Sequence, residues 1–156
     1  MEKDLVERLQ GTSINPKTFL STDYFNHFNG VIMILDMLPD LPELMPEVEA
    51  WSFVTYPEHF DRSGLSIAEL AKEAYRHCPE AIRAGFEDLV GEMRQAVEQA
   101  RAELRSLTAL GTERFAALAR QSAAQLQCYV VQGSSLINGT NAAPDQADID
   151  ALFSTP

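Results

Sequence analysis

One histidine, His27, is of a residue type that could carry out phosphotransfer chemistry. His27 lies in the run DYFNHFN, residues 23–29. An imidazole on the exposed side of a helix can accept a phosphoryl group, because its nitrogens titrate near neutral pH. A histidine at the edge of an apolar helix face, hydrogen-bonded to a neighbour, is the more common arrangement. His27 is therefore a candidate phosphoacceptor, with a structural role as the alternative.

Two other groups of polar side chains suggest metal binding or catalysis. Glu58, His59 and Asp61 carry metal-ligating atoms, but they crowd into a stretch expected to be a loop, so no metal is predicted. A glutamine-rich run indicates a solvated or inter-subunit helix face. The sequence has no Gly-rich phosphate loop, GxSxG or HExxH, so we predict no cofactor and no catalytic residue. The members of the glutamine-rich run are Gln121, Ser122, Gln125, Gln127 and Gln132.

The end of the chain forms a small amphipathic unit after the polar stretch 138–143. Ile149, Leu152 and Phe153 follow one another at the i, i+3 and i+4 spacing of one helix face, and Asp148 and Asp150 lie off that face. A tethered segment of this kind suits helix-in-groove recognition, in which a few apolar anchors provide the affinity. The alternative is that the segment packs on its own bundle.

Residues 146–153 (QADIDALF) resemble the acidic, apolar peptides that dock on receiver domains of the chemotaxis response regulator CheY. Such peptides stand at the N-terminus of the flagellar switch protein FliM and at the C-terminus of the phosphatase CheZ, a dimeric helical hairpin. The resemblance implies docking of a receiver domain. The acid-x-x-x-Gln pattern with which CheZ orients water is absent from the predicted hairpin, so the resemblance does not extend to catalysis.

The element on which the rest of the chain depends is a long helical hairpin over residues 79–137. Apolar residues recur at steps of three and four along both arms, which places them on one face of each helix. Gly111 is expected to end the first arm and Thr112 to cap the second. The first stripe is Phe86, Leu89, Val90, Met93, Val97, Ala100, Leu104 and Leu107, and the second is Phe115, Leu118, Ala119, Leu126, Tyr129, Val130, Gly133 and Leu136.

Two shorter helices are predicted to cover these stripes. The first, Asp23–Leu38, begins at a cap formed by Ser21 or Thr22, and Gly30 within it suggests a close helix–helix approach. The second, Ser66–His77, begins at the capping-box pattern SIAE, and Leu65 and Leu70 have the spacing of a hydrophobic staple.

The remaining segments are predicted to be less regular. The proline-rich stretch 39–57 should close one end of the core, with a short helix from Pro46. Strand signals are weak throughout the sequence, and Trp51–Tyr56 is the one stretch compatible with a short strand. Trp51 is expected to be apolar fill, with a small-molecule pocket beside it as the alternative. Residues 1–10 are expected to form a loosely held arm.

Composition excludes several classes of partner. The chain has 156 residues, 12 Lys and Arg against 23 Asp and Glu, and a formal net charge of −11. This balance argues against nucleic acid and membrane surfaces, whose binding depends on basic residues. Cys78 and Cys128 are too few for a disulfide framework and are expected to be buried. The charged N-terminus lacks the apolar run of a signal peptide, so we expect a cytoplasmic protein.

Together these patterns predict an all-α helical bundle over residues 1–137, followed by a linker and peptide over 138–156. Two long apolar seams favour a homodimer. The leading functional prediction is a non-enzymatic adaptor of bacterial signalling that docks a response-regulator receiver domain. The alternatives are histidine phosphotransfer through His27 and a structural, self-associating bundle.

Overall fold

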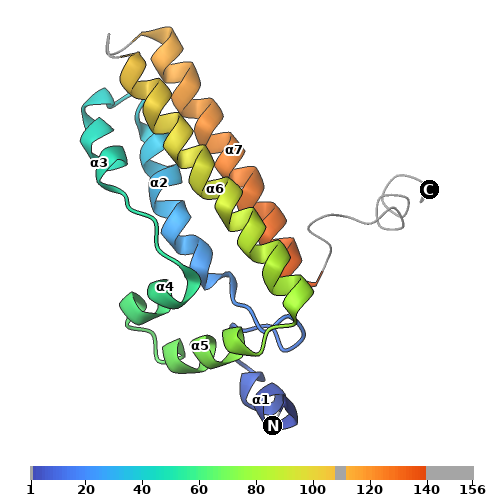
Figure 1. Cartoon of the computed structure of the whole chain (residues 1–156). Coiled ribbons are helices and arrows are strands. Elements are labelled where there is room, and N and C mark those ends of the chain that lie inside the picture. The colour runs from blue at the N-terminus through green and yellow to red at the C-terminus, as the bar shows by residue number, and fades with distance from the viewer. Residues whose placement is uncertain (1, 108–111, 140–156) are drawn as a thin grey trace, which may run out of the picture.

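The computed structural model describes residues 2–107 and 112–139, and it confirms the all-α prediction. No β-strand occurs in these two ranges. Figure 1 shows the longer helices side by side, with the shorter helices at one side and one end. The helices are α1 (Glu2–Leu9), α2 (Asn26–Met37), α3 (Met45–Ala50), α4 (Tyr56–Ser63), α5 (Ala68–Arg76), α6 (Glu80–Ser106) and α7 (Glu113–Asn138), with 3-10 turns η1 (Thr22–Phe25) and η2 (Pro42–Leu44).

Helices α6 and α7 form the predicted antiparallel hairpin. The residues buried on α6 are members of the predicted stripe, and they include Phe86, Met93 and Leu104. On α7 the buried face runs from Phe115 to Ile137. The hydroxyl of Thr112 accepts the Phe115 N–H at 3.1 Å and caps α7 as predicted. Residues 108–111, which include the predicted helix end at Gly111, lie outside the described ranges.

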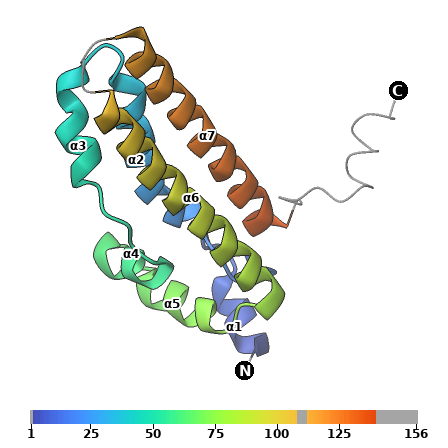
Figure 2. The same cartoon turned by 45° about the horizontal axis from the view of Figure 1, so that its top comes forward.

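Helix α2 packs on α7, as α6 does, so α7 contacts both helices. In the view of Figure 2, α2 lies behind α6. The predicted cap at Ser21 is present, because its Oγ accepts the Asp23 N–H at 3.1 Å. The first turn after the cap is the 3-10 turn η1, and α2 begins at Asn26 and ends at Met37. The predicted helix over residues 23–38 is thus confirmed, except for the geometry of its first turn.

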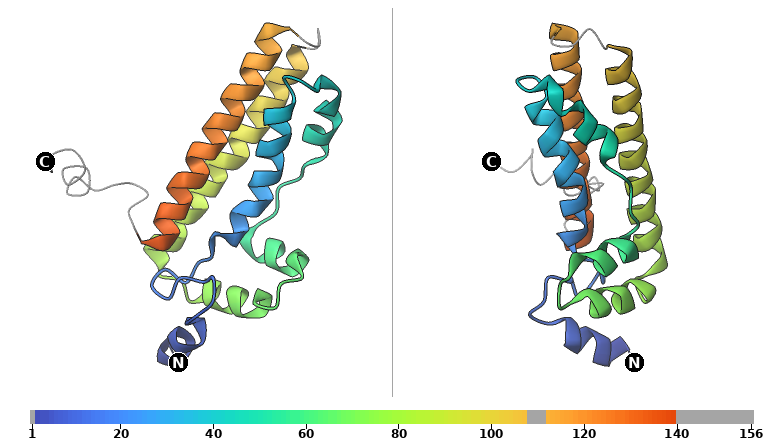
Figure 3. Two further views of the ribbon diagram at one scale, coloured as in Figure 1. Left: turned by 180° about the vertical axis from the view of Figure 1, so that it is seen from behind. Right: turned by 90° about the vertical axis from the view of Figure 1, so that its left-hand side faces the viewer.

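The predicted positions of two segments were wrong. Residues 51–55, called here the extended segment, run from α3 to α4 along the open side between α2 and α6 (Figure 3, right). The proline-rich stretch thus covers the side of the bundle. Helix α5 packs with α4 at one end of the bundle, where its Tyr75 lies edge-on to Phe86 at the start of the hairpin stripe, and it does not run along the stripe. Prolines shorten the secondary structure in 39–57 and leave an extended chain, which fits the narrow space between two helices.

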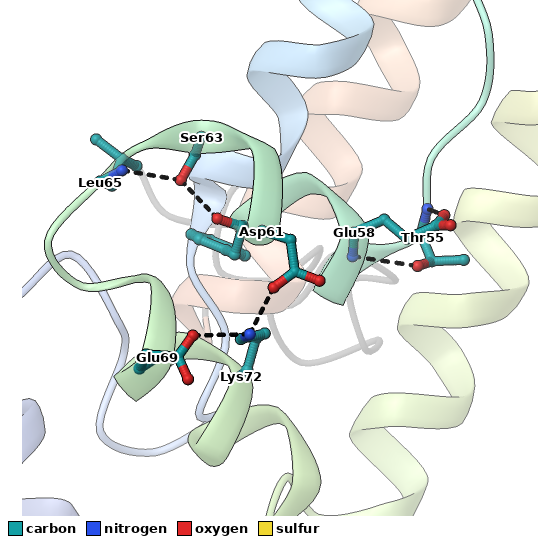
Figure 4. A network of polar contacts seen from close by, with 8 residues as sticks. Thr55, Glu58, Asp61, Ser63, Leu65, Glu69 and Lys72 are labelled. Atoms are coloured by element: carbon teal, nitrogen blue, oxygen red, sulfur yellow. Dashed lines mark hydrogen bonds and ion pairs between the residues drawn. The ribbon is translucent and has the colours of Figure 1, made fainter.

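The capping box was also assigned to the wrong helix. Thr55 and Glu58 form it at the start of α4: the Glu58 N–H donates to Thr55 Oγ1 at 3.3 Å and the Thr55 N–H to Glu58 Oε1 at 2.8 Å (Figure 4). Pro57 lies in the first turn of α4, where no backbone donor is required. Helix α5 starts at Ala68 without a side-chain cap, because Ser66 lies in the turn closed by the Ala68 N–H and the Leu65 carbonyl.

The close approach between helices is at Gly133 and not at Gly30. Gly30 is exposed, and a Cβ added there would meet nothing within 4 Å. A Cβ on Gly133 would lie 2.3 Å from Cζ of Phe25. The absent side chain of Gly133 therefore allows the Phe25 ring to lie against the backbone of α7.

Three further expectations about burial were wrong. The N-terminal arm is an ordered helix, α1, whose Leu5 and Leu9 are buried in the core. Cys128 is exposed, whereas Cys78 is buried and its Sγ donates to the Thr18 carbonyl at 3.2 Å. The staple leucine Leu65 is 43% exposed.

The apolar stripes of the hairpin are covered within one copy of the chain. Phe86, Val97, Leu126 and Val130 belong to a single core together with residues of η1, α2 and α3. The homodimer was predicted because two apolar seams would need a partner. Since the seams are covered within one copy, they do not by themselves require a second one. Among the described helices, none is both long and apolar enough to cross a membrane.

Candidate functional site

The predicted docking residues, Asp148, Ile149, Asp150, Leu152 and Phe153, lie outside the described ranges. The structure does describe where α7 ends ahead of them. Gly139 caps the helix with φ 74°, and its N–H donates to the Leu136 carbonyl at 3.2 Å. The hydroxyl of Thr18 donates to the Ile137 carbonyl at 2.5 Å. The last turn of α7 is thus held to the N-terminal part of the chain.

His27 lies in the first turn of α2, against Trp51. The two rings stack with centroids 4.7 Å apart and planes at 28°. His27 Nε2 is buried and has no hydrogen-bond partner in the described structure. Burial lowers the pKa of the His27 imidazole, and the backbone of Ser52 acts in the opposite direction. A phosphoryl donor would have to displace part of this packing to reach Nε2.

Trp51 fastens the extended segment to both neighbouring helices. Its indole N–H donates to the His27 carbonyl on α2 at 3.0 Å. On the other side, Arg101 of α6 donates through Nε to the Val48 carbonyl at 3.0 Å and through Nη2 to the Trp51 carbonyl. The Arg101 guanidinium also lies 5.4 Å from the Trp51 ring centroid. These contacts agree with the expectation that Trp51 is a packing residue.

The rest of the extended segment is held in the same way. Tyr24 of η1 donates its hydroxyl to the Val54 carbonyl at 2.7 Å. The guanidinium of Arg94 on α6 lies 4.6 Å from the centroid of the Phe53 ring. The side chains that hold residues 51–55 thus come from η1 and α6, which are distant from the extended segment in sequence.

Glu58, His59 and Asp61 lie on α4 and each has a structural contact. Glu58 completes the capping box, and Asp61 pairs with Lys72 of α5 at 2.5 Å (Figure 4). The His59 ring lies edge-on to Tyr24 at 5.7 Å, and burial lowers the pKa of its imidazole. Within the described residues, no three His, Cys, Asp or Glu side chains are grouped so that they could hold a metal ion.

An apolar hollow of about 700 Å³ lies between α3 and the hairpin, where sequence analysis predicted no site. Arg105 and Glu49 pair at its rim through two hydrogen bonds of 2.8 Å. Its lining comes from three separate helices, so only their packing reveals it. The residues that line it are Met45, Pro46, Glu49, Ala50, Leu104, Arg105 and Phe115.

A smaller polar groove of about 220 Å³ lies between α6 and α7. It contains Gln121 and Gln125 of the predicted glutamine-rich run, together with Gln99 and Glu103 of α6. Gln99 Nε2 donates to Glu103 Oε1 at 2.9 Å. The groove thus presents amide and carboxylate oxygens above a floor of Ala96, Ala100 and Ser122, which suits hydrogen bonding to water or to a polar side chain.

Searches with this chain found no matching protein family, curated protein or solved structure.

Proposed function

We propose that the chain is a non-enzymatic regulatory or adaptor protein of bacterial signalling, which docks a response-regulator receiver domain through residues 146–153. The observation that carries this proposal is the sequence pattern itself. Three apolar anchors, Ile149, Leu152 and Phe153, have the i, i+3 and i+4 spacing of one helical face, and the spacing of Asp148 and Asp150 predicts them off it. This is the arrangement used in helix-in-groove recognition.

The fold is compatible with such a role. Helix α7 ends at Asn138 with a left-handed cap at Gly139, seven residues before Gln146. The contact from Thr18 to the Ile137 carbonyl fixes this end of the helix. A bundle with an ordered last turn is a suitable base for a short recognition peptide, because the tether keeps the peptide near the bundle.

The number of anchors sets the expected affinity. Burying one large apolar side chain contributes about 1.5–3 kcal/mol, and ordering a peptide costs about 2–5 kcal/mol. Three anchors therefore leave at most about 7 kcal/mol, which supports only weak binding with a dissociation constant of about ten micromolar or more. Weak, reversible docking suits a signalling contact.

The proposal is tested by titrating a fluorescently labelled CheY-type receiver with the protein. Four forms are compared: the full chain, a chain ending at Asn141, the triple variant Ile149→Ala, Leu152→Ala, Phe153→Ala, and Ala151→Ser. The full chain and Ala151→Ser should bind equally, since the spacing predicts Ala151 on the helical face opposite the anchors. The truncated chain and the triple variant should not bind. Equal binding by all four forms, or no binding by the full chain, contradicts the proposal.

The alternative, phosphotransfer through His27, has less support because Nε2 of His27 is buried beside Trp51. It predicts an acid-labile label on the protein after incubation with a phosphorylated receiver. Label that persists in His27→Ala excludes it.

A further inference from the structure

The two arms of the hairpin differ sharply in charge. Helix α6 carries ten charged side chains in 27 residues, as expected for a helix with one side in water. Helix α7 carries three in 26 residues, and the last of them is Arg120. The run Gln121–Asn138 has no charged residue, although the chain contains 23 Asp and Glu and 12 Lys and Arg.

This uncharged run includes exposed residues as well as core residues. Val131 is 57% exposed, and Ala124, Gln127 and Cys128 are exposed as well. Figure 3 (left) shows α7 from behind, where none of the other described helices covers it. We call these four residues of α7 the uncharged face.

Helix α2 extends this face on one side. The two helices are antiparallel, and Phe25 lies against Gly133. Met33, eight residues further along α2, is therefore about level with Gln125. Met33 is 63% exposed, and Asn26, Asn29 and Gly30, on the N-terminal side of it, are exposed and uncharged. The exposed Asp36 bounds this uncharged surface on the C-terminal side of Met33.

We propose that the uncharged face, with the adjoining exposed residues of α2, binds a second copy of this chain. Two molecules of net charge −11 repel each other. A contact between copies is therefore best made where carboxylates are absent, and the uncharged face is such a place.

The side-chain types also favour a symmetric contact. Around a two-fold axis each surface meets itself, so its groups have to be self-complementary. An amide both donates and accepts hydrogen bonds, whereas a carboxylate only accepts and an ammonium only donates. Gln127 and Asn29 can therefore pair with their own copies.

The size of the surface suits a small dimer contact. The uncharged run of 18 residues is about 27 Å long at 1.5 Å per residue, and two helices are together about 20 Å wide. The flat footprint is therefore roughly 540 Å², which is below the roughly 800 Å² that a standard interface buries on each partner.

The first test measures the mass of the full chain by light scattering and compares two Ala→Glu variants. Both replaced residues are exposed on a helix: Ala124 on α7 and Ala102 on α6. The full chain should be a dimer of twice 17.3 kDa. Ala124→Glu should raise the dimer dissociation constant at least about tenfold, because it places two like charges in the contact. Ala102→Glu should leave the constant unchanged.

The second test uses the native cysteines. Cys128 is exposed and lies near the middle of the uncharged run, so a short bis-maleimide should join two copies through it. Cys78 is buried, and Cys128→Ser should therefore abolish cross-linking. A monomer at high protein concentration overturns the proposal, and so does a dimer that only Ala102→Glu weakens. A chain ending at Asn141 should still dimerise, which separates this test from that of receiver docking.

Discussion

A single missing methyl group determines how closely η1 approaches α7. Gly133 allows the Phe25 ring to lie where a Cβ would be only 2.3 Å from Cζ. Phe25 is 2% exposed and packs against the rings of Tyr24 and Phe86, so it has little room to move.

Gly133→Ala should therefore destabilise the protein by about 1–3 kcal/mol, the usual cost of overpacking a core. Gly30→Ala is the matched control, because Gly30 is exposed within α2 and its added Cβ would meet nothing within 4 Å. It should stabilise the protein by up to about 1 kcal/mol, since alanine favours the helix. Urea unfolding of the two variants measures both changes, and equal effects would contradict the packing described here.

The burial of His27 predicts a dependence of stability on pH. The folded-state pKa of His27 lies below its ordinary value of 6.5, so the unfolded chain binds a proton first as the pH falls. The free energy of unfolding should therefore decrease as the pH falls from about 7 to about 5. Burial lowers the pKa of His59 in the same direction, so His59 should contribute to the decrease.

His27→Gln should lose less stability than the natural sequence over this range. Urea unfolding midpoints at the two ends of the range measure the difference. His77→Gln, at an exposed position, is the control and should follow the natural sequence. A His27→Gln curve parallel to that of the natural sequence would show that His27 is not buried as a neutral group.

At the scale of elements, the start of α4 rests on the capping box of Thr55 and Glu58. Thr55→Ala should cost about 1 kcal/mol of stability, because it removes the acceptor for the Glu58 N–H. Ser66→Ala provides the comparison, since α5 begins without a side-chain cap. Ser66→Ala should change the unfolding free energy little. A loss of stability as large as that of Thr55→Ala would instead support the capping box predicted at Ser66.

The sequence predicted the long helices better than their packing. The stripes of α6 and α7 follow from a sustained period of three and four residues, which local sequence alone specifies. The choice between two capping-box patterns, TYPE at 55–58 and SIAE at 66–69, does not follow from the pattern alone. Pro57 is one of the prolines expected to interrupt regular structure in the stretch 39–57, although proline is well suited to the first turn of a helix.

The extended segment could not be predicted because its partners are distant in sequence. Arg101 is 50 residues from Trp51, and Tyr24 is 30 residues from Val54. The surroundings of His27 could not be predicted for the same reason. Its stacking on Trp51 depends on how α3 and the extended segment fold back on α2. The docking residues 146–153 remain a prediction.

At the scale of the whole molecule, the N-terminal helix is part of the core. Leu9 is 0% exposed, and Arg8 pairs with Glu73 of α5 through two hydrogen bonds of 2.8 and 3.0 Å. Helix α1 therefore connects the start of the chain to the end of the bundle that α4 and α5 close (Figure 1).

Leu9→Ala should lower the unfolding free energy by about 2–5 kcal/mol, as for other buried leucines. Leu65→Ala removes the same atoms from a side chain that is 43% exposed, and it should cost much less. Chemical denaturation of both variants decides the matter. A small loss for Leu9→Ala would mean that α1 is a loosely held arm after all.

Carbonyl groups of the extended segment accept hydrogen bonds from side chains that are distant in sequence. Those of Trp51 and Val54 accept hydrogen bonds from Arg101 and Tyr24, while the segment lacks the repeating amide bonds of a helix. We therefore expect this stretch to open locally without disrupting the packing of α7 against α2 and α6. Its amides should exchange with solvent deuterium well before those in the middle of α7, through brief local openings.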